Sequence, residues 1–295
     1  MNNFKISQIQ FQAKDTPLEN ALLLEKLFQK TMLRDELRKE APDFDWEQKL
    51  IFSEHHFSHA ASAFYPSPFR EATVLTMDGV GEWATTTYGS GSQAQLELLD
   101  EVRFPDSLGL LYSTVTDFLG FRVLSDEYKV MGLAPYGNPQ YVDKVAQVLP
   151  LKDGGLYEWK AECFNFSNGV VSYPDNLPTV APLFGRKFEE LFGPARKKGD
   201  ELTQYHMDLA ASVQRHTEEV IFHVLRRLHE LTGLTRVCIA GGVAQNSVAN
   251  GKITRNTPFE EVYIPSAGHD AGISIGSAQY HIHQTLGRPR TAPIY

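Results

Sequence analysis

The stretch Glu54-His55-His56-Phe57-Ser58-His59-Ala60-Ala61-Ser62-Ala63 is the part of the chain around which the rest is organised. If it is helical, His55 and His59 lie one turn apart and project from the same face, as two ligands of one metal ion must. Asp78 follows in Thr76–Gly81, an apolar segment that ends in a carboxylate and glycines. Such a strand end can hold a third ligand or an aspartate that handles phosphate. Taken alone, the histidine pair leaves two interpretations open, a metal site or an ordinary helix surface or core.

The composition is that of a globular protein with an acidic balance. The 295 residues are 42% hydrophobic and 22% charged, which is enough for one large domain or two lobes. The formal charge of -8 disfavours nucleic acid as a partner. We find no apolar run of about 18 residues and no leader at Met1, so we expect neither a membrane span nor a signal peptide, and a cytoplasmic protein. Cys163 and Cys238 cannot form a disulfide framework, and Cys238 is expected to be a small buried hydrophobe.

The first third of the chain predicts helix followed by strands. A helical pattern runs through residues 18–32, and the charged residues 34–40 are its solvated last turns or a linker. Residues 49–53 form a short strand candidate that leads into the histidine stretch. Residues 72–77, 83–89 and 95–104 are extended segments separated by glycines, which predicts an antiparallel meander.

The middle of the chain mixes helices with an irregular part. Ser107 can cap a helix over residues 108–120. Acidic, basic, apolar and glycine residues alternate in the segment 125–137, which is either a ligand contact through Lys129 and the Gly132 backbone or a plain junction between helix and loop. Residues 151–200 form an irregular insertion. A long helix then runs over 204–231 and ends at Gly233.

Two similar units close the sequence. A buried strand at 236–240 precedes the loop Gly241–Asn246, and a strand at 261–264 precedes the loop Gly268–Gly272, each loop opening a helix. A strand, a glycine turn and a helix start present free backbone N–H groups to an anionic or nucleotide ligand. Two such loops at one sheet edge would build a cleft.

Five motifs in this order resemble the O-carbamoyltransferases related to nodulation and antibiotic-tailoring enzymes, from about residue 49 to the C-terminus. They are His55-His56-Phe57-Ser58-His59-Ala60-Ala61-Ser62, Met77-Asp78-Gly79-Val80-Gly81-Glu82-Trp83, Tyr128-Lys129-Val130-Met131-Gly132-Leu133-Ala134, Gly241-Gly242-Val243-Ala244-Gln245-Asn246 and Asp270-Ala271-Gly272. The resemblance implies an α/β fold of the actin/hexokinase-like (RNase H-like) nucleotide-binding type, with a mixed sheet and helices, as in the tRNA threonylcarbamoyl transferases.

The same resemblance implies a metal site. The family's ligands fall on His55, His59, Asp78 and Asp270, with iron as the expected metal. Two imidazoles and two carboxylates also suit Mn(II) or Zn(II) and leave positions for substrate oxygens. We assign His56 no ligand role.

The implied reaction moves a carbamoyl group from carbamoyl-adenylate, made from carbamoyl phosphate and ATP, to a hydroxyl of a small molecule. By the resemblance, Gly241, Gly242 and Asn246 line the nucleoside pocket, with Lys129 and Gly132 nearby. The sequence names no general base and no acceptor.

The chain departs from the family pattern at both ends. The family's opening strand and serine-bearing phosphate loop are not found, so we expect residues 1–48 to be a helical remnant of a first lobe. Residues 49–295 are then the metal- and nucleotide-binding carbamoyltransferase lobe. A C-terminal adenylate-forming domain is expected to be absent, so a separate domain or subunit would be a partner. Two alternatives stay open, a tRNA threonylcarbamoyl transferase-like enzyme and a catalytically silent nucleotide-binding partner subunit.

Overall fold

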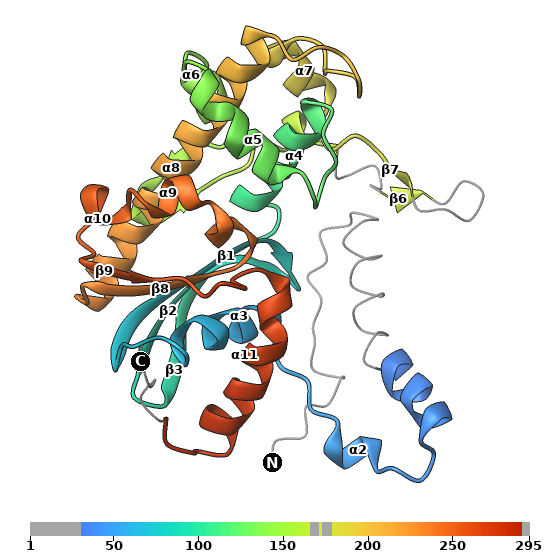
Figure 1. Ribbon diagram of the computed structural model, residues 1–295, viewed down its shortest axis with the longest axis vertical. Coiled ribbons are helices and arrows are strands. Elements are labelled where there is room, and N and C mark those ends of the chain that lie inside the picture. The colour runs from blue at the N-terminus through green and yellow to red at the C-terminus, as the bar shows by residue number, and fades with distance from the viewer. Residues whose placement is uncertain (1–30, 166–170, 173–178, 291–295) are drawn as a thin grey trace. The chain divides into compact units, whose positions relative to one another are not determined.

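A computed structural model describes residues 31–165, 171–172 and 179–290 (Figure 1). The chain divides into two compact units, residues 1–51 with 165–181 and residues 52–164 with 182–295. Each unit is described by itself. No helix within the described ranges combines the length and apolar character needed to cross a membrane.

The first unit contributes a helix over residues 31–40 and the short helix α2 (Trp46–Lys49). The two-residue strands β6 (Val171–Ser172) and β7 (Thr179–Val180) pair antiparallel. Most of the helix predicted over 18–32 lies outside the described residues. The strand predicted over 49–53 is wrong, because Lys49 ends α2 and residues 50–54 adopt no strand. The Ile51 side chain is 57% exposed, so its apolar character does not come from burial in a sheet.

The second unit is built on a five-stranded mixed sheet with the order β3-β2-β1-β8-β9. The strands are β1 (Glu71–Gly81), β2 (Ala84–Ser92), β3 (Gln95–Arg103), β8 (Arg236–Ala240) and β9 (Glu261–Tyr263). β1, β2 and β3 form the predicted antiparallel meander, while β8 runs parallel to β1 and β9 parallel to β8. The predicted α/β class with a mixed sheet is therefore confirmed. The carboxyl ends of β1, β8 and β9 lie at one edge.

Strand β1 is central because its side chains are apolar or small on both faces. Val74, Leu75 and Met77 are fully buried or nearly so, and the buried Thr76 hydroxyl pairs with that of Thr87 at 2.6 Å. Strands covered on both faces lose the alternation of polar and apolar residues. Cys238 of β8 is fully buried and Cys163 is buried, both as free thiols, which confirms the expectation for Cys238.

Helices cover both faces of this sheet. Figure 1 shows α3 (His55–Phe64) and α11 (Ile273–Tyr280) on one face, and α4 (Leu108–Phe118), α5 (Glu127–Leu133) and α8 (Gln204–Thr232) on the other. Helices α6 (Val142–Val148), α7 (Arg186–Phe192), α9 (Ser247–Asn250) and α10 (Ile253–Asn256) are shorter. Ser107 caps α4 and Gly233 ends α8 in the left-handed conformation, as predicted.

Close packing of α11 against α3 depends on a glycine. A Cβ at Gly276 would lie 2.8 Å from the carbonyl carbon of Ser58 and closer still to its oxygen, so no larger residue fits without separating the helices. A glycine at a crossing lets two backbones approach. This contact fixes the start of α11 relative to the histidines of α3.

Candidate metal centre

The two predicted histidines face each other on the first turns of α3. His55 is the first residue of the helix, and the spacing to His59 brings their Nε2 atoms to 3.0 Å. The ring centroids lie 4.6 Å apart at an angle of 78°. The helix therefore aims two imidazole nitrogens at one point, as the spacing predicts.

Asp78 brings a carboxylate to the same point from the end of β1. Its Oδ2 lies 2.9 Å from His55 Nε2 and 3.1 Å from His59 Nε2. Its Oδ1 accepts the backbone N–H of Gly79 at 2.8 Å and that of Gly242 at 3.2 Å. The carboxylate is thus fixed by amides on one oxygen and presents the other to the histidines.

Asp270 closes the group from the start of the turn Asp270–Gly272 that precedes α11. Its Oδ1 lies 3.3 Å from His59 Nε2 and 3.7 Å from His55 Nε2. The Asp270 side chain is 70% exposed, whereas that of His59 is fully buried. The centre therefore has a buried floor and one solvent-facing side.

The spacing of these atoms fits a divalent metal. The four ligand atoms all lie within 4.8 Å of one another. With bonds of about 2.1 Å, neighbouring ligand atoms lie about 3.0 Å apart in an octahedral site and about 3.4 Å apart in a tetrahedral one. The contacts among His55, His59 and Asp78 measure 2.9 to 3.1 Å. Mixed imidazole and carboxylate donors suit Fe(II), Mn(II) and Zn(II).

Electrostatics in the metal-free protein favour an ion pair at the same place. Burial opposes the charge on Asp78, but hydrogen bonds from His55 and His59 hold its pKa well below the usual range. Burial also disfavours a proton on His59, yet hydrogen bonds to Asp270 and Asp78 raise its pKa. A proton on the His59 imidazole therefore occupies a position that a metal would take. The Nδ1 of His59 is buried and has no hydrogen-bond partner among the described residues.

Gly81 makes room for His55. A Cβ at this position would lie 2.7 Å from His55 Cγ and 2.9 Å from its Nε2. Only a residue without a side chain leaves the imidazole where it is. The sequence motif contains Gly81, but nothing in the sequence revealed that its neighbour would be a histidine.

His56 points away from this centre and has a structural role. Its Nδ1 pairs with the Thr76 hydroxyl at 2.6 Å and its Nε2 with the Ala84 carbonyl oxygen at 2.8 Å. Burial lowers the pKa of His56 to about 4. The ring is therefore neutral near pH 7 and joins α3 to the sheet, in keeping with the absence of a ligand role in the sequence analysis.

The two glycine loops meet beside the centre. The N–H of Gly241 donates to the Gly268 carbonyl oxygen at 2.7 Å, and the N–H of Gly242 reaches Asp78. Asn246 is turned inward: its amide exchanges hydrogen bonds with Gln214 at 2.9 and 3.0 Å, and its Oδ1 caps α9. These hydrogen bonds do not test the predicted nucleoside contact of Asn246, which stays a prediction.

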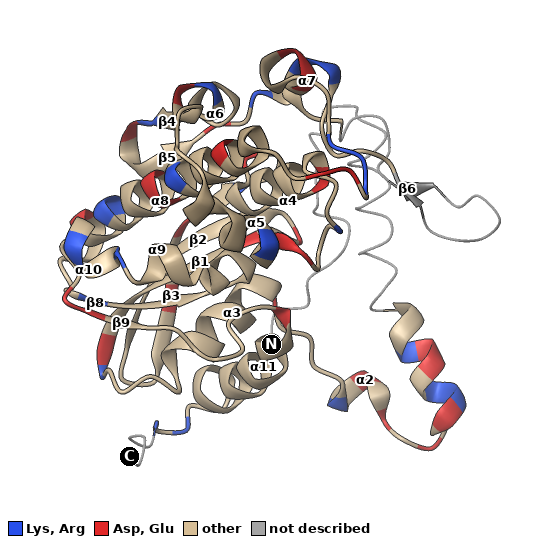
Figure 2. Ribbon diagram, turned by 45° about the horizontal axis from the view of Figure 1, so that its top comes forward, with Lys and Arg blue, Asp and Glu red and all other residues tan. Residues whose placement is uncertain are grey.

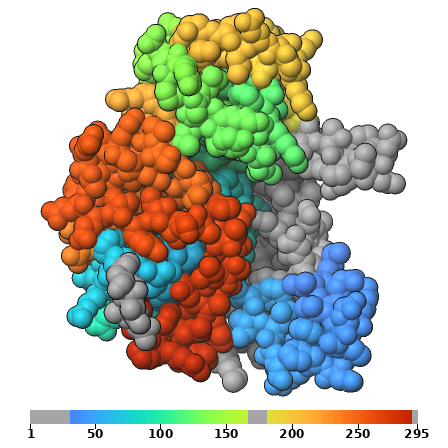
Figure 3. Space-filling model, in the orientation of Figure 1, coloured from blue at the N-terminus to red at the C-terminus, as the bar shows by residue number. Residues whose placement is uncertain are grey.

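Lys129 and Gly132 lie on α5, and the contacts described for them do not include the histidines. Lys129 pairs with Asp126 at 2.9 Å, and Gly132 is exposed with open space where a Cβ would stand. Helix α5 approaches the loop after β8, since Met131 Sδ lies 3.8 Å from Ser247 Oγ, and the green and orange surfaces meet in Figure 3. Both residues remain predicted nucleotide contacts.

Sequence reasoning recognised Ser107 only as a helix cap. Its hydroxyl also donates to the Gly79 carbonyl oxygen at 2.7 Å, so α4 supports the turn that carries Asp78. Its capping position was visible in the sequence, whereas its partner on β1 was not.

Comparison with known proteins agrees with the motifs. The family model described as "Carbamoyltransferase N-terminus" matches residues 11–279. An uncharacterized protein of Synechocystis is 46% identical over 92% of this chain and 43% of its own length. The nodulation protein NolNO of Sinorhizobium fredii is 37% identical over 90% of this chain and 36% of its own length.

A more distant relative is the tRNA N6-adenosine threonylcarbamoyltransferase of Thermomicrobium roseum, 25% identical over 82% of this chain and 65% of its own length. The chain spans about two fifths of the first two relatives. The match of the family model over most of the chain, together with the identity to these relatives, shows that the chain belongs to the carbamoyltransferase N-terminus family.

Proposed function

We propose that His55, His59, Asp78 and Asp270 hold one divalent metal, expected to be Fe(II) with Mn(II) or Zn(II) as alternatives. This centre would serve the transfer of a carbamoyl group from carbamoyl-adenylate to a hydroxyl of a small molecule. The observation that carries the proposal is the convergence of two imidazole nitrogens and two carboxylates from three separate elements. Membership of the carbamoyltransferase N-terminus family supports the reaction type.

Three of the four proposed ligands are held in place by the protein, and the fourth is exposed to solvent. His55, His59 and Asp78 would form the fixed part, since Asp78 is anchored by two backbone amides. The exposed Asp270 borders the side from which substrate would enter. When bound, a divalent metal supplies Lewis acidity to a substrate oxygen.

The nucleotide would lie across the glycine loops. We propose that Gly241, Gly242 and Asn246 line the nucleoside pocket, with Lys129 and Gly132 nearby, in an actin/hexokinase-like fold. Gly241 and Gly242 support this best, because their loop directly contacts Asp78. A backbone without side chains lets a nucleotide approach the centre closely.

The proposed transfer balances without a redox partner. The acceptor oxygen forms a bond to the carbamoyl carbon, the bond from that carbon to the phosphate oxygen of AMP breaks, and AMP leaves with the electron pair. The hydroxyl proton passes to a general base, which we do not assign to any of the described residues. We propose that a separate domain or subunit makes carbamoyl-adenylate from carbamoyl phosphate and ATP.

Metal analysis and calorimetry test the proposal together. The wild-type chain, reconstituted with Fe(II) without oxygen, is titrated with AMP and with a non-hydrolysable ATP analogue. The double variant His55→Ala/His59→Ala should lose the metal and bind nucleotide more weakly. His223→Ala, a substitution on α8, is the matched control and should change neither. If the double variant retains wild-type metal content and nucleotide affinity, the proposed centre is refuted.

A second candidate is an activity like that of tRNA threonylcarbamoyl transferases, favoured by the similarity to the Thermomicrobium roseum enzyme. The formal charge of -8 disfavours an RNA partner. A gel-shift titration with tRNA separates the two, since only this candidate predicts a shift. A chain that binds nucleotide but transfers no carbamoyl group when supplied with carbamoyl-adenylate would instead be a silent partner subunit.

A further inference from the structure

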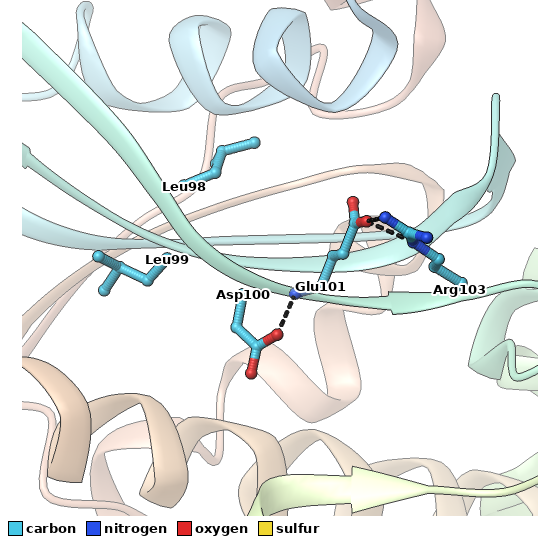
Figure 4. Close-up of a pocket in the computed structure, with 5 residues that line it drawn as sticks. All are labelled: Leu98, Leu99, Asp100, Glu101 and Arg103. Carbon is cyan, nitrogen blue, oxygen red and sulfur yellow. Dashed lines mark hydrogen bonds and ion pairs between the residues drawn. The ribbon is translucent and has the colours of Figure 1, made fainter. Parts of the chain in front are cut away.

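A second cleft, away from the metal centre, carries an excess of positive charge. It measures about 830 Å³ and is lined by the end of α4, residues 120–129 at the start of α5, and the segments 182–184 and 195–198. Another hollow, shown in Figure 4, lies along β3, but its Glu101 and Arg103 pair with each other. The cleft is therefore the better candidate for a ligand.

Four cations and two carboxylates line the cleft. Lys129 is paired with Asp126 at 2.9 Å, and Asp117 accepts the N–H of Leu183 at 2.8 Å. Burial raises the pKa of Asp117, against the hydrogen bond from Leu183 that lowers it. The two carboxylates are thus occupied by protein groups and leave the cations to dominate.

Two of the cations make no side-chain hydrogen bond or ion pair in the described part of the chain, although Asp126 lies close enough to Arg122 to interact with its charge. Neither the Arg122 guanidinium nor the Lys198 ammonium makes a hydrogen bond or ion pair there, while both line the cleft. Arg196 donates from Nε to the Leu119 carbonyl oxygen and from Nη1 to the carbonyl oxygens of Lys197 and Asp200. No carboxylate forms an ion pair with it among the described residues. The run of Lys and Arg at 196–198, blue in Figure 2, follows α7. In a chain of formal charge -8, this local excess indicates an anionic ligand.

Aromatic rings add an apolar wall to this charged cleft. The guanidinium of Arg196 and the ammonium of Lys129 lie 5.2 and 6.0 Å from the Phe121 ring centre. Phe184 also lines the cleft and packs edge to face on Phe118 at 5.3 Å. A cation over a ring face is attracted by the quadrupole of the ring. The cleft thus combines an anion-binding side with an apolar side.

Helix α4 separates this cleft from the metal centre. Its N-terminal cap, Ser107, contacts the turn that carries Asp78, and its C-terminal carbonyl of Phe118 accepts the N–H of Arg196 at 3.0 Å. Eleven helical residues span about 16 Å at 1.5 Å per residue. A small molecule in the cleft would therefore not touch the histidines.

We propose that this cleft is a second binding site, for a small phosphomonoester with a planar apolar group. Arg122, Lys198 and Arg196 would bind the phosphate, since a dianion matches several cations better than a single carboxylate does. Phe121 and Phe184 would contact the planar group. The inference does not depend on the proposed carbamoyl transfer.

Phenyl phosphate is a suitable probe because it has the phosphate and the ring but no nucleoside for the glycine loops. Calorimetry on the full chain should give saturable binding that weakens as salt rises. Arg122→Ala/Lys198→Ala should weaken it at least tenfold. Lys187→Ala/Arg215→Ala removes the same charge elsewhere and should leave it unchanged. His55→Ala should also leave it unchanged, which separates this site from the metal centre.

Three outcomes with phenyl phosphate and the control variant would overturn the proposal, and a fourth concerns the cleft variants. These are no saturable binding of phenyl phosphate, equal loss in the Lys187→Ala/Arg215→Ala control, and binding of benzoate as tight as that of phenyl phosphate. The milder variants Arg122→Gln and Lys198→Gln, each checked for a wild-type thermal midpoint, keep the test valid if the alanine pair unfolds. Binding that survives these substitutions unchanged would contradict the assignment equally.

Discussion

Gly81→Ala should disable the metal centre while leaving the surrounding strand intact. Gly81 is an extended residue at the end of β1, so the backbone accepts alanine. The new Cβ would stand 2.7 Å from His55 Cγ, whereas an ordinary contact begins at 3.4 Å, so the ring must move by at least about 0.7 Å. Metal ligands tolerate displacements of only about 0.2 Å. We therefore expect His55 to lose its position as a ligand.

The loss of metal affinity in Gly81→Ala should appear as a loss of metal-dependent stability. At a free metal concentration 100 times the Kd, binding stabilises the folded chain by about 2.7 kcal/mol. Substitutions that disturb ligand orientation weaken metal affinity by about 10 to 100-fold. A hundredfold loss would reduce the stabilisation at the same metal concentration to about 0.4 kcal/mol. Urea unfolding with and without Fe(II) or Zn(II) measures this difference within each variant, which removes any packing cost of the new methyl group.

Gly251→Ala is the matched control, since a Cβ there meets the Ser247 carbonyl oxygen at an ordinary 3.5 Å. It should keep the full metal-dependent stabilisation. If Gly81→Ala also keeps it, either His55 is no ligand or the ring relaxes without loss, and the geometric reasoning is refuted.

The metal-free protein should bind metal more weakly as pH falls, because a proton on His59 competes with the metal. Burial opposes this proton, but hydrogen bonds to the carboxylates raise the pKa of His59 above 6.5. Metal titrations from pH 5 to 8 measure how the affinity changes. Without metal, the His59 contribution to stability is complete below pH 6.5 and is lost as pH rises through its folded pKa. The Asp78 contribution is complete above pH 3.8 and is lost as pH falls through its lowered pKa. The thermal midpoint of the metal-free protein should therefore be highest between these pH values and fall at both higher and lower pH. Asn246→Ala should reduce the free energy of unfolding by about 1 to 3 kcal/mol, since it removes a helix cap and two hydrogen bonds with the buried Gln214 amide. An unchanged urea midpoint would contradict this. Gly276→Ala should push α11 from α3 at a cost of about 1 to 3 kcal/mol and weaken metal binding, as urea unfolding and chelator competition would reveal.

Local pattern in the sequence was sufficient for the main elements. The apolar period of α8 and its terminal Gly233 predicted the long helix, and glycine spacing predicted the meander β1 to β3. The metal candidates were also readable, because a histidine pair one turn apart and aspartates after strands or before helices have positions fixed by local geometry. The structure brings all four together.

Partners distant in sequence could not be read in this way. The strand expected at 49–53 had the right composition, yet none of the described strands pairs with it. The hydrogen bonds between Asn246 and Gln214 on α8 could not be predicted from the sequence, while the nucleoside contact of Asn246 stays a prediction. The contact of Gly81 with His55 was equally invisible, because periodicity reports burial and not the identity of the neighbour.

Anomalous diffraction from crystals of the chain reconstituted with Fe(II) would show whether the four side chains hold one divalent metal. We expect one strong iron peak per chain, about 2.0 to 2.2 Å from the Nε2 atoms of His55 and His59 and from a carboxylate oxygen of Asp78, with Asp270 alongside. A map with no peak between these residues, or with the iron bound elsewhere, would contradict it.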